Sequence, residues 1–158
     1  MARNDVTRSI EQLATVLRME LEKENKALNA FRLAQDYHQQ QRTKLTSLQQ
    51  YRMDYVRQLQ QEGSGGVKAH HYQQRLSFVA KLDKACEQQG HVIAQCKMAA
   101  DQRRTQWLAQ QRRRQAVEKL IEKKDQSLQI IDNRIEQQMM DELATQRLLR
   151  RSISCPRH

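Results

Sequence analysis

Proline and glycine are scarce in this sequence of 158 residues, which holds 1 Pro and 4 Gly. Folds rich in strands need many turn residues, so this scarcity argues against a sandwich, a barrel or a doubly wound sheet. The lone Pro156 lies next to the end of the chain and cannot interrupt a helix elsewhere. We therefore expect a helical protein.

Long apolar runs and paired cysteines are also missing. The sequence has no run of about 18 apolar residues, the length that could cross a bilayer, and residues 1–5 lack the apolar stretch of a signal peptide. The 3 cysteines are an odd number without a CxxC pair, which argues against a disulfide framework and fits a reducing compartment. These absences predict a soluble, cytoplasmic protein.

Glutamine and basic residues are abundant instead. The chain has 25 Gln, and 28 Lys and Arg stand against 18 acidic residues, which gives a formal net charge of +10. This mixture is too polar for a compact core, yet it is rich in residues that favour helices. The positive charge favours partners with acidic surfaces.

The residues that favour helices stop at one place, residues 63–66, where three of the four glycines are found. Such a cluster is typical of a hairpin turn or a short link. We expect a first helix over about 5–62, a turn at 63–67, a second helix over about 68–150 and a flexible tail at 151–158. Residues 1–158 would then form a single coiled-coil hairpin domain.

On both sides of this break, apolar residues recur in alternating steps of three and four, the spacing of a heptad repeat. The positions between them are mostly Arg, Gln, Lys and Glu, so each helix offers one narrow apolar seam suited to one partner helix. The first series is Ile10, Leu13, Leu17, Ala27, Phe31, Ala34, Leu45, Leu48, Tyr55 and Leu59. The second is Val79, Leu82, Cys86, Ile93, Cys96, Ala100, Trp107, Val117, Ile121, Leu128, Ile131 and Ile135.

These patterns predict an all-α fold, a long antiparallel two-helix coiled coil (an α-hairpin) whose second helix is longer than the first. Folding back at the glycines pairs residues whose numbers add up to about 130, so that Leu48 faces Leu82 and Gln41 faces Gln89. The second helix then extends beyond the first after about residue 125. Its seam continues there without a partner in the chain.

Enzymatic chemistry has little support, because two paired helices enclose no pocket that excludes water. Cys86 and Cys96 occupy seam positions and fit small packed side chains. His70, His71 and His91 have the wrong spacing for a closed zinc site. We expect no catalytic residue, no metal and no cofactor.

An arginine-rich stretch of the second helix could bind phosphates, the main source of non-specific affinity for nucleic acids. However, no aromatic platform accompanies it beyond Trp107, and no signature of a nucleic-acid-binding fold is present. A solvated face is the simplest interpretation, and a surface for an acidic protein or for nucleic acid are the alternatives. The arginines are Arg103, Arg104, Arg112, Arg113 and Arg114.

The predicted register gathers aromatic and aliphatic residues near the turn. We call this group the aromatic patch; it consists of Leu48, Tyr51, Tyr55, Phe78, Leu82 and Ala85. Tyr51, Phe78 and Ala85 lie one step off the seam and should be partly exposed. The patch is therefore either a docking surface or a locally widened core.

Around these residues the chain resembles the FliJ family of flagellar type III export proteins. The similar segments are 51–55 (Tyr-Arg-Met-Asp-Tyr), 72–78, 82–88 and 136–144, the last with Met140-Asp141-Glu142. The resemblance implies a coiled coil similar to the central stalk of rotary ATPases, with no enzymatic activity of its own. It extends over nearly the whole chain.

The resemblance also implies partners. The terminal end would enter the hexameric export ATPase and promote its assembly and activity, and the aromatic patch matches the family's binding site for the cytoplasmic domain of the membrane export gate. Export chaperones would bind as well, and the protein would be cytoplasmic and peripherally associated with the inner membrane at the flagellar base, through the gate. The residues expected to contact the ATPase are Leu128, Ile131, Ile135, Met139, Met140 and Leu143.

Two alternatives stay open. One is the equivalent stalk protein of a virulence type III secretion injectisome, which would obey the same physics in another machine. The other is a basic coiled coil that binds nucleic acid, although we expect no nucleic acid partner. Binding to nucleic acid would fall steeply as the salt concentration rises, whereas binding through an apolar patch should tolerate moderate salt.

Overall fold

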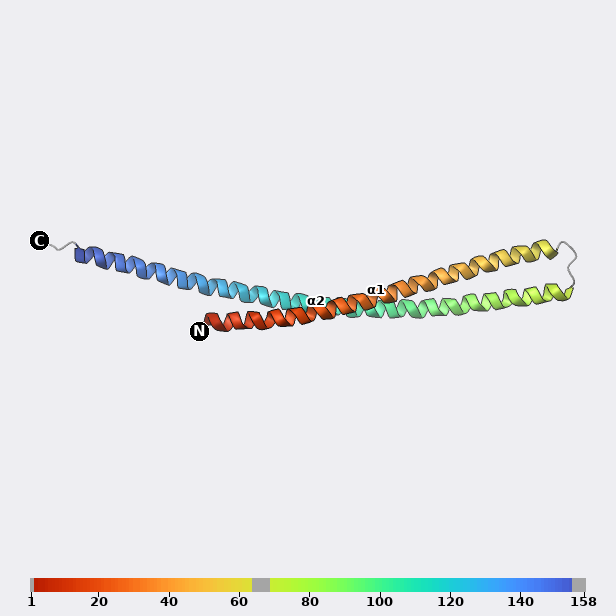
Figure 1. Ribbon diagram of the computed structural model, residues 1–158, viewed down its shortest axis with the longest axis horizontal. Helices are drawn as coiled ribbons and strands as arrows, with labels where there is room; N and C mark the ends of the chain where they lie inside the picture. The colour runs from red at the N-terminus through yellow and green to blue at the C-terminus, as the bar shows by residue number, and fades with distance from the viewer. Residues whose placement is uncertain (1, 64–68, 155–158) are drawn as a thin grey trace. The chain divides into compact units, whose positions relative to one another are not determined.

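The computed structural model describes residues 2–63 and 69–154, and every residue in these two ranges is helical (Figure 1). Helix α1 spans Ala2–Gly63 and α2 spans Ala69–Ser154, with 62 and 86 residues respectively. Their interiors contain no proline, and Gly90 is the one glycine inside them. The prediction of an all-α fold with two packed helices, the second longer, is confirmed.

The helix bounds differ slightly from the expected ones. Helix α1 begins three residues earlier, and α2 continues to Ser154 instead of stopping near residue 150. In this last turn the Ser152 and Ser154 hydroxyls donate to the backbone carbonyls of Leu149 and Arg151, at 2.9 and 3.2 Å, so these serines bond within the helix rather than ending it. Of the expected turn, Gly63 ends α1, while residues 64–67 lie outside the described residues, as does the tail at 155–158.

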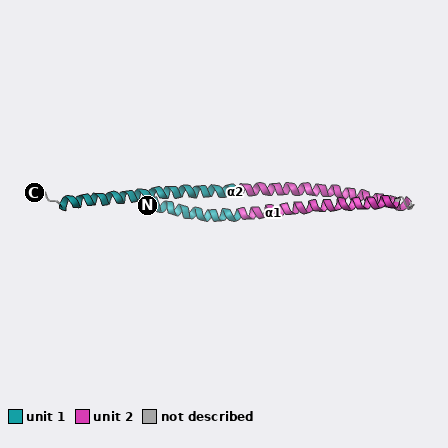
Figure 2. Cartoon of the chain, turned by 90° about the horizontal axis from the view of Figure 1, so that it is seen from above, with its two compact units in different colours: residues 1–23, 111–158 teal, residues 24–110 magenta. Residues whose placement is uncertain are grey.

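The chain divides into two compact units, each with a stretch of both helices (Figure 2). Unit 1 consists of Met1–Lys23 and Gln111–His158, and unit 2 of Glu24–Gln110. In each unit the α1 stretch lies beside the α2 stretch, as both ribbon views show. Each unit is therefore a pair of helices.

The pairing in unit 2 is antiparallel. Gln41 of α1 meets Gln89 of α2, and Phe31, earlier in α1, stacks on Trp107, later in α2, with ring centroids 5.8 Å apart. The paired residue numbers add up to 130 at Gln41 and to 138 at Phe31. The expected value of about 130 therefore holds at Gln41, and the Phe31 contact exceeds it by eight, about two helical turns.

The core is the narrow seam that the heptad pattern predicts. All ten seam positions named for α1 are buried or half-buried, and of those named for α2 only Ile135 is exposed. Because two helices cannot enclose their seam, only Leu59, Leu82 and Ala100 among the described apolar side chains are buried, and even these keep 5%, 7% and 7% of their surface exposed. Most seam residues therefore contribute less than the roughly 1.5–3 kcal/mol of full burial.

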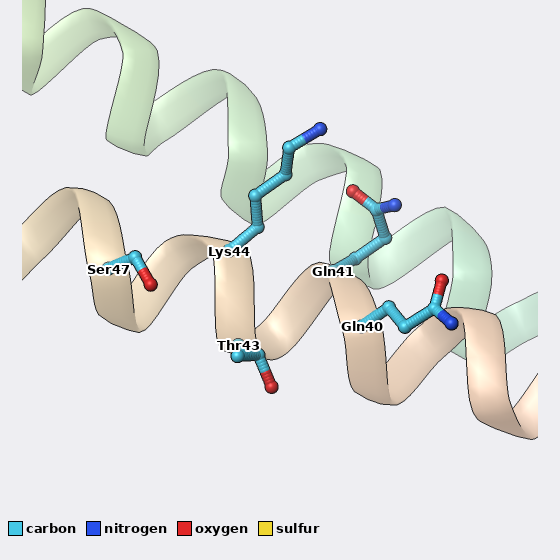
Figure 3. Close-up of a pocket in the computed structure, with 5 residues that line it drawn as sticks. All are labelled: Gln40, Gln41, Thr43, Lys44 and Ser47. Carbon is cyan, nitrogen blue, oxygen red and sulfur yellow. The ribbon is translucent and has the colours of Figure 1, made fainter.

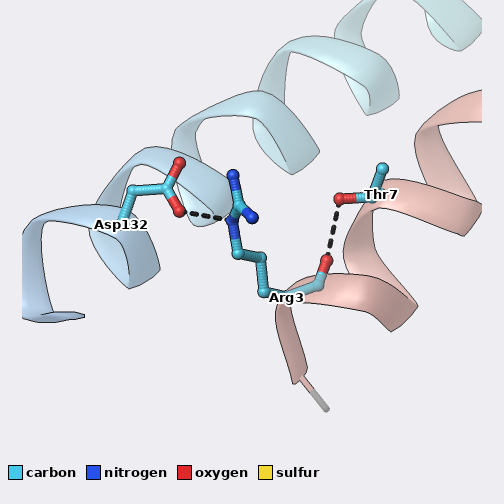
Figure 4. Close-up of polar contacts among 3 residues, drawn as sticks. All are labelled: Arg3, Thr7 and Asp132. Carbon is cyan, nitrogen blue, oxygen red and sulfur yellow. Dashed lines mark hydrogen bonds and ion pairs between the residues drawn. The ribbon is translucent and has the colours of Figure 1, made fainter.

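In unit 1 the start of α1 is fastened to α2 by an ion pair. The Arg3 Nε donates to the Asp132 Oδ1 at 2.7 Å, and the Thr7 hydroxyl donates to the Arg3 carbonyl at 2.9 Å (Figure 4). The side chains of Arg3 and Asp132 are partly exposed, so their ion pair contributes well under about 1 kcal/mol to stability. The Arg3–Asp132 pair marks how far along α2 the first helix reaches.

Beyond Asp132, every described residue of α2 is exposed. We call residues 133–154 the α2 extension. The sequence predicted that the uncovered part begins after about residue 125, which is wrong, because Leu128 and Ile131 are half-buried. The first helix starts earlier than expected, and the numbers of Arg3 and Asp132 add up to 135, so α1 reaches further along α2.

Candidate docking surfaces

The aromatic patch joins the two helices of unit 2 through three rings. Phe78 of α2 packs against Tyr55 of α1 with ring centroids 4.9 Å apart, and it meets Tyr51 edge-on at 6.5 Å. Tyr51 and Tyr55, one helical turn apart, also lie 6.5 Å from each other. Edge-to-face and tilted pairs at these distances are favourable arrangements, so the rings hold one another in place.

The patch members differ in how much of each side chain solvent reaches. Tyr51 is 52% exposed and Phe78 36%, as their places one step off the seam predicted. Leu82 is only 7% exposed, and Leu48, Tyr55 and Ala85 are half-buried. The structure thus brings aromatic residues from both helices together, with Tyr51 and Phe78 outward and Leu82 in the helix interface.

Two ion pairs accompany the patch, one within its span along the helices and one between the patch and the turn. Arg52 pairs with Asp83, and Arg75 pairs with Glu62, each linking α1 to α2. Because all four side chains are partly exposed, these pairs add little stability. They help to fix the register in which the rings of the patch meet.

A buried polar contact follows the patch along the seam. The Gln89 Nε2 donates to both the Gln41 Oε1, at 2.8 Å, and the Gln41 carbonyl, at 2.9 Å, and Gln41 is 9% exposed. Figure 3 shows Gln41 and Lys44 extending from α1 towards α2, whereas Thr43 points away. These residues, with Gln40 and Ser47, line a shallow groove of about 350 Å³.

The α2 extension carries a second exposed apolar surface. Of the six residues expected to contact the ATPase, Leu128 and Ile131 are half-buried, while the other four, Ile135, Met139, Met140 and Leu143, are exposed. Sequence reasoning missed three more exposed residues there: Leu148, Leu149 and Ile153, at 66%, 57% and 80%. Leu148 and Ile153 fall outside the seam phase, whereas Leu149 continues it beyond the last position considered, and the signal for all three is a basic helix end in which Arg147, Arg150 and Arg151 are interspersed with apolar residues.

The cysteines and histidines considered in the sequence form no metal site among the described residues. Cys86 and Cys96 are free and half-buried on the seam, and Cys155 lies outside the described residues. No group of three or more His, Cys, Asp or Glu residues that could hold a metal occurs in residues 2–63 and 69–154. His70 bonds with Gln74, and its ring lies 6.3 Å from that of His71 at an angle of 59°.

The arginine-rich stretch is divided between the two units. In unit 2, Arg103 and Arg104 are exposed, and Arg103 donates to Gln106 at 3.3 Å. In unit 1, Arg114 is half-buried and pairs with both carboxylate oxygens of Glu118 at 2.9 Å.

Neither of the described helices is long and apolar enough to span a membrane.

Comparison with known proteins decides the family. The family model described as Flagellar FliJ protein matches residues 9–152, nearly the whole chain. This chain belongs to the FliJ family. The resemblance seen in the sequence is thereby confirmed.

A Flagellar FliJ protein of Escherichia coli (strain K12) is 26% identical to this chain over 113 residues, which cover 72% of this chain and 77% of that protein. No solved structure matches the chain. Membership of the FliJ family makes the protein a component of flagellar protein export. Both candidate docking surfaces, the aromatic patch and most of the α2 extension, lie within the matched residues.

Proposed function

We propose that this FliJ family member links the hexameric export ATPase to the membrane export gate, contacting the ATPase with the α2 extension and the gate with the aromatic patch. The observation that carries this proposal is the α2 extension. A helix without cover in its own chain keeps large apolar side chains in water, which is costly unless a partner buries them.

The α2 extension supports contact with a protein ring. Met139, Met140 and Leu143 are 60%, 63% and 54% exposed, so a partner can remove most of their surface from water. Methionine side chains are flexible and polarisable, which suits a surface that packs against several subunits in turn. Arg147, Arg150 and Arg151 would meet acidic groups of the ring.

The aromatic patch supports contact with the cytoplasmic domain of the gate. Tyr51 and Phe78 are held by ring contacts and yet remain partly exposed, so little side-chain entropy is lost when a partner covers them. Aromatic side chains of this kind are the usual centres of protein interfaces. Leu82, which is buried, would act by supporting Phe78 and not by touching the gate.

Two further parts of the proposal come from the family resemblance alone. Export chaperones would bind the chain, and the protein would be cytoplasmic and reach the inner membrane at the flagellar base through the gate. No cofactor takes part in either role. The protein would act without catalytic residues, as a coupling element for the ATPase.

The injectisome alternative loses weight because the matched family is the flagellar one. The nucleic-acid alternative is the second candidate, favoured by the net charge of +10. It predicts affinity for DNA or RNA that falls steeply between about 50 and 200 mM salt. Gate binding that persists over this range, without comparable binding to nucleic acid, would exclude it.

The test uses two variants measured in two assays. A chain that ends at Asp132 should no longer stimulate the ATPase activity of the purified export ATPase, but it should bind the gate domain as the full chain does. Replacing Tyr51 and Phe78 with Ala should weaken gate binding by about 2 kcal/mol or more, roughly thirtyfold, and leave ATPase stimulation and helical content intact. Full stimulation by the shortened chain would refute the role of the α2 extension.

A further inference from the structure

The α2 extension continues a helix face that α1 covers only as far as Asp132. Leu128 and Asp132, one turn apart, are half-buried in unit 1, and Asp132 contacts Arg3 of α1. Alternating steps of four and three residues from Leu128 pass through Asp132 and then reach six exposed positions beyond it. This spacing is that of a surface that packs against one helix. We call the six positions the extension face; it consists of Ile135, Met139, Glu142, Gln146, Leu149 and Ile153.

The extension face has the same order of apolar and polar residues in both directions along the helix. Its members form three pairs centred on Ala144, of which the outer and the middle pair are apolar and the inner pair is polar. The pairs are Ile135 with Ile153, Met139 with Leu149, and Glu142 with Gln146, at nine, five and two residues on either side of Ala144. A segment with this symmetry is complementary to a second copy of itself that runs in the opposite direction.

We propose that two copies of this chain pair through their α2 extensions, antiparallel and about a two-fold axis at Ala144. The numbers of facing residues then add up to 288, so each of the three pairs forms twice between the copies. Isoleucine meets isoleucine, methionine meets leucine, and the Glu142 carboxylate accepts a hydrogen bond from the Gln146 amide of the second copy. The contact extends along about 33 Å of each helix, and the second copy occupies the place that α1 leaves free beyond Asp132.

The charges beside the extension face fit the same alignment. In an antiparallel coiled coil, the row of residues next to the contact on one helix meets the same row of the other helix. On one side this row is Glu136, Leu143 and Arg150. Glu136 therefore meets Arg150 of the second copy at both ends, and the two Leu143 side chains meet at the axis. The row on the other side is uncharged and adds no repulsion; it consists of Gln138, Thr145 and Ser152.

Other alignments of two extensions are less complementary. A parallel pair places each residue beside its own copy, so that two Glu142 carboxylates face each other. Antiparallel pairs shifted by one heptad, with sums of 281 or 295, place Met139 opposite Glu142 or Leu149 opposite Gln146. Only the alignment about Ala144 brings apolar residues opposite apolar ones and acidic residues opposite amides or arginines.

The pairing removes from water a set of apolar side chains that α1 does not cover. Leu149 and Ile153, which are 57% and 80% exposed, lie outside the residues expected to contact the ATPase, yet they have facing partners in the second copy. The pairing does not depend on the proposed function, because its complementarity lies within the chain. Since one face cannot contact two partners at once, self-pairing and the proposed contact with the ATPase would exclude each other.

The test measures the dimerisation of the full chain by sedimentation equilibrium, with a reducing agent that keeps cysteines from linking the copies. The unchanged chain should form dimers that dissociate on dilution within the range of about 5 to 200 µM. Glu136→Arg and Arg150→Glu each place like charges at both ends of the pair. Each variant alone should therefore dimerise at least fivefold more weakly.

An equal mixture of these two variants supplies the decisive result. A dimer with one copy of each again pairs arginine with glutamate at both ends, so the mixture should recover the affinity of the unchanged chain. The matched controls are Asp141→Arg and Arg151→Glu, which make the same changes of charge away from the contact and should alter the affinity less than twofold. All four variants should keep the helical content of the unchanged chain.

Two results would overturn the pairing. One is a full chain that stays monomeric up to about 200 µM, a concentration at which even a weak dimer would be populated. The other is a dimer that neither charge reversal weakens, or a mixture that dimerises no better than its components, because the copies would then meet at another surface. Neither result bears on stimulation of the ATPase, which is measured separately.

Discussion

At the scale of single residues, the seam is less apolar than a stable two-helix core would require. Gln41 and Gln89 occupy facing seam positions and bond to each other instead of packing against leucines. A polar pair inside a coiled coil fixes the register, because a slipped pairing would leave a buried amide without a partner. The expected register holds at this pair.

The Gln41–Gln89 pair gives a prediction for stability. Gln89→Ala leaves the Gln41 amide without its partner and should lower the free energy of unfolding by about 1–2 kcal/mol. Changing both residues to Leu should restore or exceed the original stability, since a buried polar pair can be replaced by apolar side chains without loss. Urea unfolding followed by circular dichroism measures both, with the exposed neighbour Gln88→Ala as the control.

Trp107 gives a second prediction. Its ring stacks on Phe31 at an interplanar angle of 24°, and its Nε1 is buried without a hydrogen-bond partner among the described residues. Trp107→Phe keeps the stack and removes this donor, so it should change the free energy of unfolding by less than about 1 kcal/mol. Trp107→Ala should lower it by about 2–3 kcal/mol, because Trp107 is only half-buried.

Thermal unfolding of the Trp107 variants separates the two effects. A Phe variant as unstable as the Ala variant would mean that Nε1 makes a hydrogen bond that matters. The sequence placed Trp107 on the seam correctly, but it could not name the ring it meets. That contact depends on how far the two rings lean along their helices as well as on the register, since the paired numbers add up to 138 here and to 130 at Gln41 and Gln89.

At the scale of the helices, the heptad pattern was sufficient for the seam. Every seam position that it named in α1, and in α2 up to Ile131, is buried or half-buried, although Leu28 and Val56 of α1 are half-buried off the seam. It could not place the start of the α2 extension, because that point depends on the first residue of α1 and on the register together. The helix start expected near residue 5 is poorly fixed by local sequence, and Arg3 proved to be inside the helix.

The aromatic patch was predicted less completely. Its members follow from the spacing of Tyr51, Tyr55 and Phe78, and their ring contacts agree with it. Leu82 was expected on the seam and is buried there; what did not follow is that it is only 7% exposed and so out of a partner's reach, because the heptad pattern alone does not tell how closely neighbouring side chains cover a seam position. A seam leucine beside an exposed ring supports the surface without being part of it.

Gly90 gives a prediction for α2. It lies in the interior of the helix, and a methyl group added there would meet no atom within 4 Å. Gly90→Ala should therefore raise the free energy of unfolding by about 0.5–1 kcal/mol, because alanine loses less backbone entropy on folding. Chemical denaturation measures the gain, and a loss of stability would contradict the described helix.

At the scale of the whole molecule, helix pairing and the proposed ATPase contact use different residues. The seam holds α1 and α2 together, whereas the α2 extension contributes no buried side chain. A chain that ends at Asp132 should accordingly unfold in urea with the same midpoint as the full chain, within error, while its helical signal falls in proportion to the residues removed. A lower midpoint would show that the extension packs against the rest of the chain.

The most direct test of the account is photo-crosslinking from the α2 extension. A photoreactive amino acid at position 139, whose Met side chain is 60% exposed, is activated in a mixture of the full chain, the export ATPase and the gate domain. The account predicts crosslinks from position 139 to the ATPase, and from position 51 to the gate. Crosslinks from position 139 to α1 of the same chain, with none to the ATPase, would contradict it.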